Sequence, residues 1–103
     1  MAKYCMVNNI KEECIEQYTE AHKNFWPELR EVFRASGAKE CTIFLYGKQS
    51  ILYLESEDLD KTFDLLGQDE TNQKWQAMGK DWFENPDGFQ VNLTDMVFDL
   101  NEV

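Results

Sequence analysis

Residues 40–55, ECTIFLYGKQSILYLE, decide the fold. The runs at 40–46 and 50–55 are rich in β-branched and aromatic side chains, and only Gly47-Lys48-Gln49 separates them. Two β-prone runs joined by a short turn that contains glycine are typical of a β-hairpin. The hairpin lies near the middle of a chain of 103 residues, so the segments on either side of it set the topology.

The segment before the hairpin predicts a strand followed by a helix. Residues 3–8 form a short run suited to a strand. From about Lys11, apolar residues recur at spacings of three and four, which is the pattern of one broad helical face. Pro27 lies inside this pattern, so we expect a kink or break near residues 24–26. Gly37 then supplies the stop signal of the helix.

The segment after the hairpin predicts two helical regions, at about 58–66 and 70–83, and a final strand at 91–100 beyond the turn at 85–88. The complete order is β-α-β-β-α-β, which predicts an α+β, ferredoxin-like fold with an antiparallel sheet. Domains of this kind often pair sheet to sheet as dimeric α/β barrels. We therefore expect one domain over residues 1–103 that forms a homodimer.

The composition favours a small neutral ligand. Acidic side chains outnumber basic ones by 20 to 10, which gives a formal net charge of −10. A field of this sign repels nucleic-acid phosphates and anionic lipid, so we expect no nucleic-acid and no membrane partner. No apolar run approaches the roughly 18 residues of a membrane span. Cys5, Cys14 and Cys41 are odd in number and lack CxxC spacing, which indicates reduced thiols in a cytoplasmic protein.

The motifs of cofactor-dependent enzymes are absent from the sequence. It contains no GxxxxGK[ST] or GxGxxG loop for phosphates and no GxSxG nucleophile elbow. One histidine and scattered cysteines do not make a zinc site by themselves, and we interpret the 20 acidic residues as a solvated surface. We therefore expect neither a metal nor a cofactor.

The residues best suited to chemistry lie in the first helix. Tyr18, His22 and Trp26 follow one another at intervals of four, so Tyr18 and His22 share one helical face, and Trp26 joins them if the break before Pro27 permits. A phenol and an imidazole make directional hydrogen bonds, and an indole stacks on the C–H groups of a sugar ring. The spacing alone favours another interpretation, an amphipathic core helix with a histidine at its edge.

The residues around His22 change this balance. Residues 18–29, YTEAHKNFWPEL, resemble the Y-x-x-x-H-x-x-x-W-P-E-L signature of the L-rhamnose mutarotase family. Further similarities to that family follow in the same order along nearly the whole chain: Ser36-Gly37-Ala38 before the strand that contains Cys41, Gln73-Lys74-Trp75-Gln76-Ala77-Met78, Asn85-Pro86-Asp87, and Val97-Phe98-Asp99-Leu100. The resemblance implies an isomerase that needs no cofactor and acts on a small neutral monosaccharide.

The resemblance also implies roles for single residues. His22 falls on the family's proton donor, Tyr18 on a sugar-binding tyrosine, and Trp75 on the first of two adjacent tryptophans that contact the substrate. Two departures from the family matter for the sugar contacts, beside a replaced proline at Gln90. Cys41 replaces a tyrosine that contacts the sugar, and Gln76 replaces the second tryptophan. The catalytic residue is kept while part of the sugar-contacting wall has changed, which makes L-fucose, another 6-deoxyhexose, an alternative substrate.

A mutarotase interconverts α and β anomers by opening the pyranose, rotating C1 and closing the ring again. Opening delivers a proton to the ring oxygen and removes one from the anomeric hydroxyl. The ordinary pKa of histidine, about 6.5, makes both protonation states available near neutrality. We expect His22 to protonate the ring oxygen, with Tyr18 fixing a hydroxyl and Trp75 stacking on the ring. The sequence leaves the complementary base open.

Two other classes of protein remain as alternatives at this stage. Cofactor-free monooxygenases and stress-response domains of the dimeric α/β-barrel type also place a histidine and aromatic residues in a central pocket. A structural dimer without catalysis is the third reading, because the wall at Cys41 and Gln76 has changed. The Trp26-Pro27-Glu28-Leu29 element and the turn at Asn85-Pro86-Asp87 favour the mutarotase over the first of these alternatives.

Overall fold

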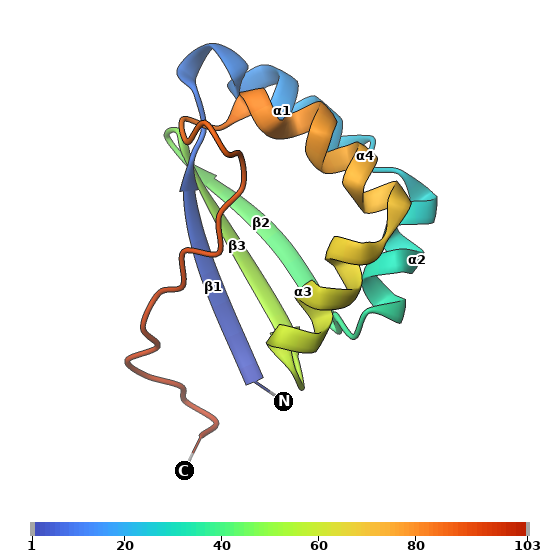
Figure 1. Cartoon of the computed structure of the whole chain (residues 1–103). Helices are drawn as coiled ribbons and strands as arrows, with labels where there is room; N and C mark the ends of the chain where they lie inside the picture. The colour runs from blue at the N-terminus through green and yellow to red at the C-terminus, as the bar shows by residue number, and fades with distance from the viewer. Residues whose placement is uncertain (1, 103) are drawn as a thin grey trace.

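The computed structural model describes residues 2–102, and within them the elements follow the predicted order as far as the last helix. The strands and α-helices are β1 Ala2–Asn9, α1 Ile15–Lys23, α2 Pro27–Ala35, β2 Glu40–Tyr46, β3 Gln49–Ser56, α3 Leu59–Gln68 and α4 Glu70–Gly79. The strands form an antiparallel sheet in the order β1-β3-β2, and the helices cover one face of it (Figure 1). This arrangement confirms the α+β fold and is consistent with the ferredoxin-like class.

The predicted hairpin forms the sheet's centre and one edge. Tyr46 pairs with Gln49, so Gly47 and Lys48 alone make the turn. Gly47 has φ +61°, a left-handed conformation that glycine adopts without steric cost. β3 is the central strand because it pairs with β1 on one side and β2 on the other. The side chains on its helix-facing side are therefore fixed from both edges.

The predicted break in the first helical region is confirmed. α1 ends at Lys23, and α2 begins at Pro27, with the backbone of Trp26 extended between them. Proline suits the first position of a helix because its missing N–H has no helical partner there. The second helical region is also divided: Asp69 ends α3, and its carboxylate accepts a hydrogen bond from the backbone N–H of Asn72 at the start of α4.

The core lies between the sheet and the helices. Met6, Leu54 and Leu29 are fully or almost fully buried there. Asn8 at the end of β1 is a buried polar residue whose amide both donates to the carbonyl of Gln90 and accepts from its N–H. This pair of bonds ties the segment after α4 to the sheet, at the side where the functional residues gather.

The predicted final strand at residues 91–100 is wrong. Only Leu93 forms a bridge there, opposite Met6, and the rest of the segment runs beside β1 without strand structure (Figure 1). A strand is stabilised when its alternate side chains pack on neighbours. Here Val97 is 94% exposed and Phe98 is 75% exposed, so no packing compensates for the entropy of extending the ladder. The segment nonetheless occupies the side of β1 where a fourth strand of this fold would pair.

Candidate active site

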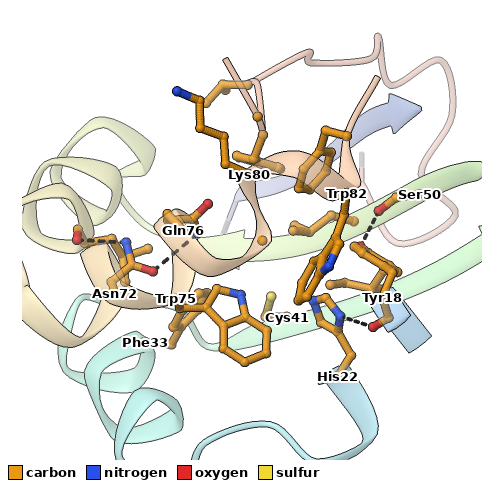
Figure 2. Close-up of a pocket in the computed structure, with 18 of the residues that line it drawn as sticks. Tyr18, His22, Phe33, Cys41, Ser50, Asn72, Trp75, Gln76, Lys80 and Trp82 are labelled. Carbon is orange, nitrogen blue, oxygen red and sulfur yellow. Dashed lines mark hydrogen bonds between the residues drawn. The ribbon is translucent and has the colours of Figure 1, made fainter. Parts of the chain in front are cut away.

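A cavity of about 480 Å³ lies between the sheet and its helical cover. Aromatic side chains form much of its wall: Tyr18, Phe25, Phe33, Phe63, Trp75, Trp82, Phe83 and Phe89. Polar side chains also line it: His22, Cys41, Ser50, Asn72, Gln76, Lys80 and Asp87. Figure 2 shows how several of them converge from α1, α4 and the sheet. A mostly apolar cavity with a few polar groups is the usual form of a site for a small ligand.

His22 stands at the junction of this cavity with a second hollow. That hollow, of about 510 Å³, lies at the open edge of β2 and shares His22, Cys41 and Ile43 with the first. The imidazole is therefore accessible from the interior cavity and from the sheet edge. A side chain at such a junction can meet a ligand without being sealed in the core.

The hydrogen bond at Nδ1 fixes the tautomer of His22. Nδ1 lies 2.7 Å from the main-chain carbonyl oxygen of Tyr18, one helical turn earlier. A carbonyl oxygen only accepts, so Nδ1 carries the proton and Nε2 of the neutral ring keeps its lone pair. Burial lowers the pKa of His22 below its ordinary value, and the bond to the carbonyl offsets part of this effect. At neutral pH the ring is therefore mainly neutral and ready to accept a proton at Nε2.

Tyr18 is packed directly against His22. The two ring centroids are 4.2 Å apart, and the tyrosine is only 4% exposed. Its hydroxyl lies 2.7 Å from the hydroxyl of Ser50 on β3, and burial raises the pKa of the phenol. The predicted pair on one helical face is thus brought together with a third polar group that comes from the sheet.

Trp75 joins the site from α4, whereas Trp26 lies behind it. The rings of Trp75 and His22 meet edge to face with centroids 5.3 Å apart, so the indole forms a wall beside the imidazole. Trp26 packs edge to face on Trp75 at 5.1 Å, and it is not among the described residues that line the cavity. Trp26, which was predicted as a site residue, therefore supports Trp75 from outside the cavity and does not line it.

The two positions at which the sequence analysis expects a departure from the family both line the cavity. Cys41 lies on β2 with its thiol toward the cavity, and burial raises the pKa of this thiol to about 11. Gln76 lies on α4, and its amide nitrogen donates to the side-chain oxygen of Asn72 over 3.4 Å. The amide oxygen of Gln76 points away from this bond (Figure 2). The site therefore offers a neutral thiol and an amide acceptor at these positions.

Ser50, Asn72 and Trp82 are site residues that the sequence analysis missed. Ser50 is the one polar residue among Ser50, Leu52 and Leu54, which face the helices from alternate positions of β3. Trp82 follows Trp75 by seven residues, about two helical turns, and its ring centroid lies 6.4 Å from that of His22. Both periodicities were available in the sequence. For Asn72 the sequence carries no such signal.

Together, these features define a class of protein: an α+β domain with an aromatic cavity that holds one neutral imidazole, suited to a small ligand rich in hydroxyl groups. Within residues 2–102, no three His, Cys, Asp or Glu side chains are grouped so that they could hold a metal ion. No helix in the same range is long and apolar enough to cross a membrane. The family model described as L-rhamnose mutarotase matches residues 3–103, and the chain belongs to the L-rhamnose mutarotase family.

Individual relatives agree with this assignment. An L-rhamnose mutarotase from Lachnoclostridium phytofermentans is 34% identical over 82 residues, covering 77% of this chain and 78% of the relative. One from Listeria monocytogenes is 34% identical over 90 residues, covering 85% and 82%. The crystal structure of an L-rhamnose mutarotase from Formosa agariphila superposes with a TM-score of 0.80 over 97% of this chain and 99% of that one, at 21% identity. It confirms the fold, and the family resemblance inferred from the sequence is confirmed by the other matches.

Proposed function

We propose that this protein is an isomerase that interconverts the α and β anomers of L-rhamnose by opening and closing the pyranose ring. The observation that carries the proposal is the neutral imidazole of His22, with Nε2 free and a tryptophan wall beside it, in a member of the L-rhamnose mutarotase family. The comparisons do not favour L-fucose, a monooxygenase or a non-catalytic domain.

In the proposed reaction, His22 is the proton-transfer residue. Ring opening moves one proton away from the anomeric hydroxyl and another onto the ring oxygen, and a well-placed acid or base contributes roughly 10²–10⁴-fold to such a step. The lone pair on Nε2 suits the removal of the anomeric proton, and the imidazolium so formed carries the proton that the ring oxygen needs, which is the transfer expected of His22 from the sequence. The hydrogen bond from Nδ1 to the Tyr18 carbonyl holds the ring in one orientation throughout.

The same proposal assigns the sugar contacts. The face of Trp75 stacks on C–H groups of the pyranose, and Tyr18 and Gln76 bond its hydroxyls. Cys41 provides a small, neutral side chain where a larger phenol would otherwise fill space. The β2 side of the wall, with Cys41 and Ile43, is thus largely apolar, which suits a 6-deoxyhexose because its methyl group needs an apolar surface.

We also propose that the protein is a homodimer formed through the bare face of its sheet, and that it is cytoplasmic. Since Cys41 and Ile43 face the helices, the alternate residues Phe44 and Tyr46 face the other way. These two side chains are 59% and 76% exposed. A second copy would cover such an apolar surface, and the free thiols suit a reducing compartment. Light scattering on the Phe44→Glu variant should report a monomer, and an unchanged mass would contradict this interface.

Exchange NMR on L-rhamnose tests the reaction and the role of His22 together. The intact protein should accelerate exchange between the two anomeric signals, and the His22→Ala variant should lose roughly 10²–10⁴-fold of that acceleration. Lys23→Ala, which changes the exposed neighbour of His22 on α1, is the matched control and should retain the parent rate. Parent-level exchange by His22→Ala would overturn the role of His22, and no acceleration by the intact protein would overturn the function.

A further inference from the structure

A stripe of two indoles and one glycine runs from α4 into the short 3₁₀ helix Lys80–Trp82 that follows it. Trp75, Gly79 and Trp82 are spaced by four and three residues, so they lie on one face of this stretch. All three residues line the cavity. The glycine therefore leaves bare main chain on the cavity wall between two indole rings.

The neighbour of Gly79, and not its backbone, requires a glycine at this position. Gly79 has φ −92° and ψ 0°, a conformation that is open to residues with a side chain. A Cβ there, however, would lie only 2.8 Å from two carbon atoms in the six-membered ring of Trp82. Carbon atoms that are not bonded pack at about 3.5–4.0 Å. The indole of Trp82 thus rests on the main chain of Gly79, and any side chain there would push it away.

The other contacts of Trp82 hold its ring at the end of the cavity where His22 lies. Its main-chain carbonyl accepts a hydrogen bond from the N–H of Lys11 over 2.8 Å, which ties Trp82 to the segment after β1. Its ring meets those of Tyr18 and Trp75 edge to face, with centroids 6.0 and 6.2 Å away. The planes of the two indoles are 80° apart, so they form a corner, and His22 lies beside both (Figure 2).

We propose that Trp82 is a second indole wall of the sugar site, beside Trp75, and that Gly79 is the residue that positions it. Position 76, where the resemblance to the family expects an indole, holds glutamine, and Trp82 supplies an indole six residues later. The inference rests on the proposed mutarotase function and deepens it, because it names the surface that holds the pyranose.

An aromatic corner suits a sugar that must bind in two anomeric forms. One face of the pyranose stacks on Trp75, and the C–H bonds at the rim of the ring meet Trp82. Neither contact depends on the direction of the anomeric hydroxyl, so both anomers gain from the corner alike. Interactions of equal strength in the ground state and the transition state lower KM and leave kcat unchanged. The effect of Trp82 should therefore appear in KM.

Two substitutions of Trp82 test the aromatic contact in anomer-exchange kinetics on L-rhamnose. Trp82→Phe keeps a flat aromatic face, and Trp82→Leu keeps apolar bulk without one. Trp82→Leu should raise KM roughly 3–10-fold and Trp82→Phe less than about 3-fold, with kcat nearly constant in both. Equal KM values for the two variants, or a loss confined to kcat, would overturn the role of Trp82.

A double-mutant cycle tests the positioning role of Gly79. Gly79→Ala should raise KM about as much as Trp82→Leu, because the new methyl group displaces the indole. In the Trp82→Leu protein, the same substitution should add nothing further, since no indole is left to displace. Additive effects of Gly79→Ala and Trp82→Leu on KM would show that Gly79 does not act through Trp82.

Binding measured by NMR separates this inference from the proposed function. The three tryptophans give three indole N–H signals, and Trp82→Phe identifies the signal of Trp82 by its loss. Addition of L-rhamnose to the intact protein should shift the signals of Trp75 and Trp82, whereas that of Trp26, outside the cavity, should move least. A shift of the Trp75 signal without one of the Trp82 signal would overturn the inference, while the His22→Ala kinetics still support the function.

Discussion

Replacing Asn72 with alanine would remove the support of the cavity wall on α4. The side chain of Asn72 is buried, and its nitrogen donates to the carbonyl oxygen of Leu66 at the end of α3 over 2.9 Å. Its oxygen accepts from the amide of Gln76 over 3.4 Å. Asn72 thus connects α3 to α4 and orients the amide that we place against the sugar.

The expected loss of stability follows from these two bonds. A net contribution of about 0.5–1.5 kcal/mol is usual for one buried hydrogen bond, and the longer bond to Gln76 contributes less. The carbonyl of Leu66 still accepts from the N–H of Asp69, so it is not left without a partner. Alanine also has a higher helix propensity than asparagine, which offsets up to about 0.5 kcal/mol of the lost stability. We therefore expect a net loss of about 0.5–1.5 kcal/mol, which lowers Tm by roughly 2–12 °C in a domain of this size.

Calorimetry and anomer-exchange kinetics on two variants measure this effect. Gln73→Ala is a close control, since Gln73 makes the same kind of bond to the carbonyl of Gly67 but is exposed and outside the cavity wall. It should cost less than about 0.5 kcal/mol and leave KM unchanged. Asn72→Ala should raise KM several-fold at constant kcat because the amide of Gln76 is no longer held. Equal Tm and KM for the two variants would refute the reasoning.

Three further predictions concern the site and the fold. Burial lowers the pKa of His22, so the imidazole should stay neutral until the pH falls below about 6.5. The rate of anomer exchange, measured by NMR, should therefore stay level down to that pH and decline only below it. A decline that begins near pH 7.5 would contradict the role of His22 as a neutral base. A thiol pKa of about 11 should make Cys41, although it is an exposed residue, roughly tenfold slower toward iodoacetamide at pH 8 than a cysteine of ordinary pKa, because the loss of thiolate outweighs the higher reactivity of each thiolate; mass spectrometry of the labelled protein can check this against the unfolded chain. Gly37→Ala should cost roughly 1–3 kcal/mol, because Gly37 has φ +103° and a new Cβ would lie 3.0 Å from the hydroxyl of Thr62. Gly67→Ala, on an open helical surface, should instead stabilise by about 0.5–1 kcal/mol in the same thermal unfolding assay.

Local patterns in the sequence predicted most of the fold. The hairpin at 40–55 needs only β-prone runs and a glycine turn, and the break before Pro27 follows from the geometry of one ring. The proximity of Tyr18 and His22 follows from helical spacing. All three depend only on residues that are close together in the sequence, so a local pattern is enough to predict them.

The failures involve surfaces that meet only in the folded chain. The run at 91–100 alternates as a strand should, but the apolar side chains of its second half, Met96, Val97, Phe98 and Leu100, are 56–94% exposed and do not pack on the described sheet. The bond between Tyr18 and Ser50 joins residues 32 positions apart, and no spacing rule connects them. The cavity position of Trp75 and the outer position of Trp26 depend on how α4 packs against α2 and the residue that precedes it. Sequence patterns identify the face of a helix, but not the neighbour that it meets.

The division of the cavity wall explains how its sugar contacts could change while the chemistry stays. His22, the proposed proton-transfer residue, lies on α1, and the backbone carbonyl of Tyr18 on the same helix fixes its tautomer. Cys41 and Gln76 lie on β2 and α4, and neither makes a hydrogen bond to Tyr18 or His22 among the described contacts. Substitutions on those elements therefore reshape the proposed sugar-holding surface without disturbing the orientation of His22. Ser50 is the exception, because its hydroxyl bonds that of Tyr18, whose ring packs on His22, and so connects the sheet to this site.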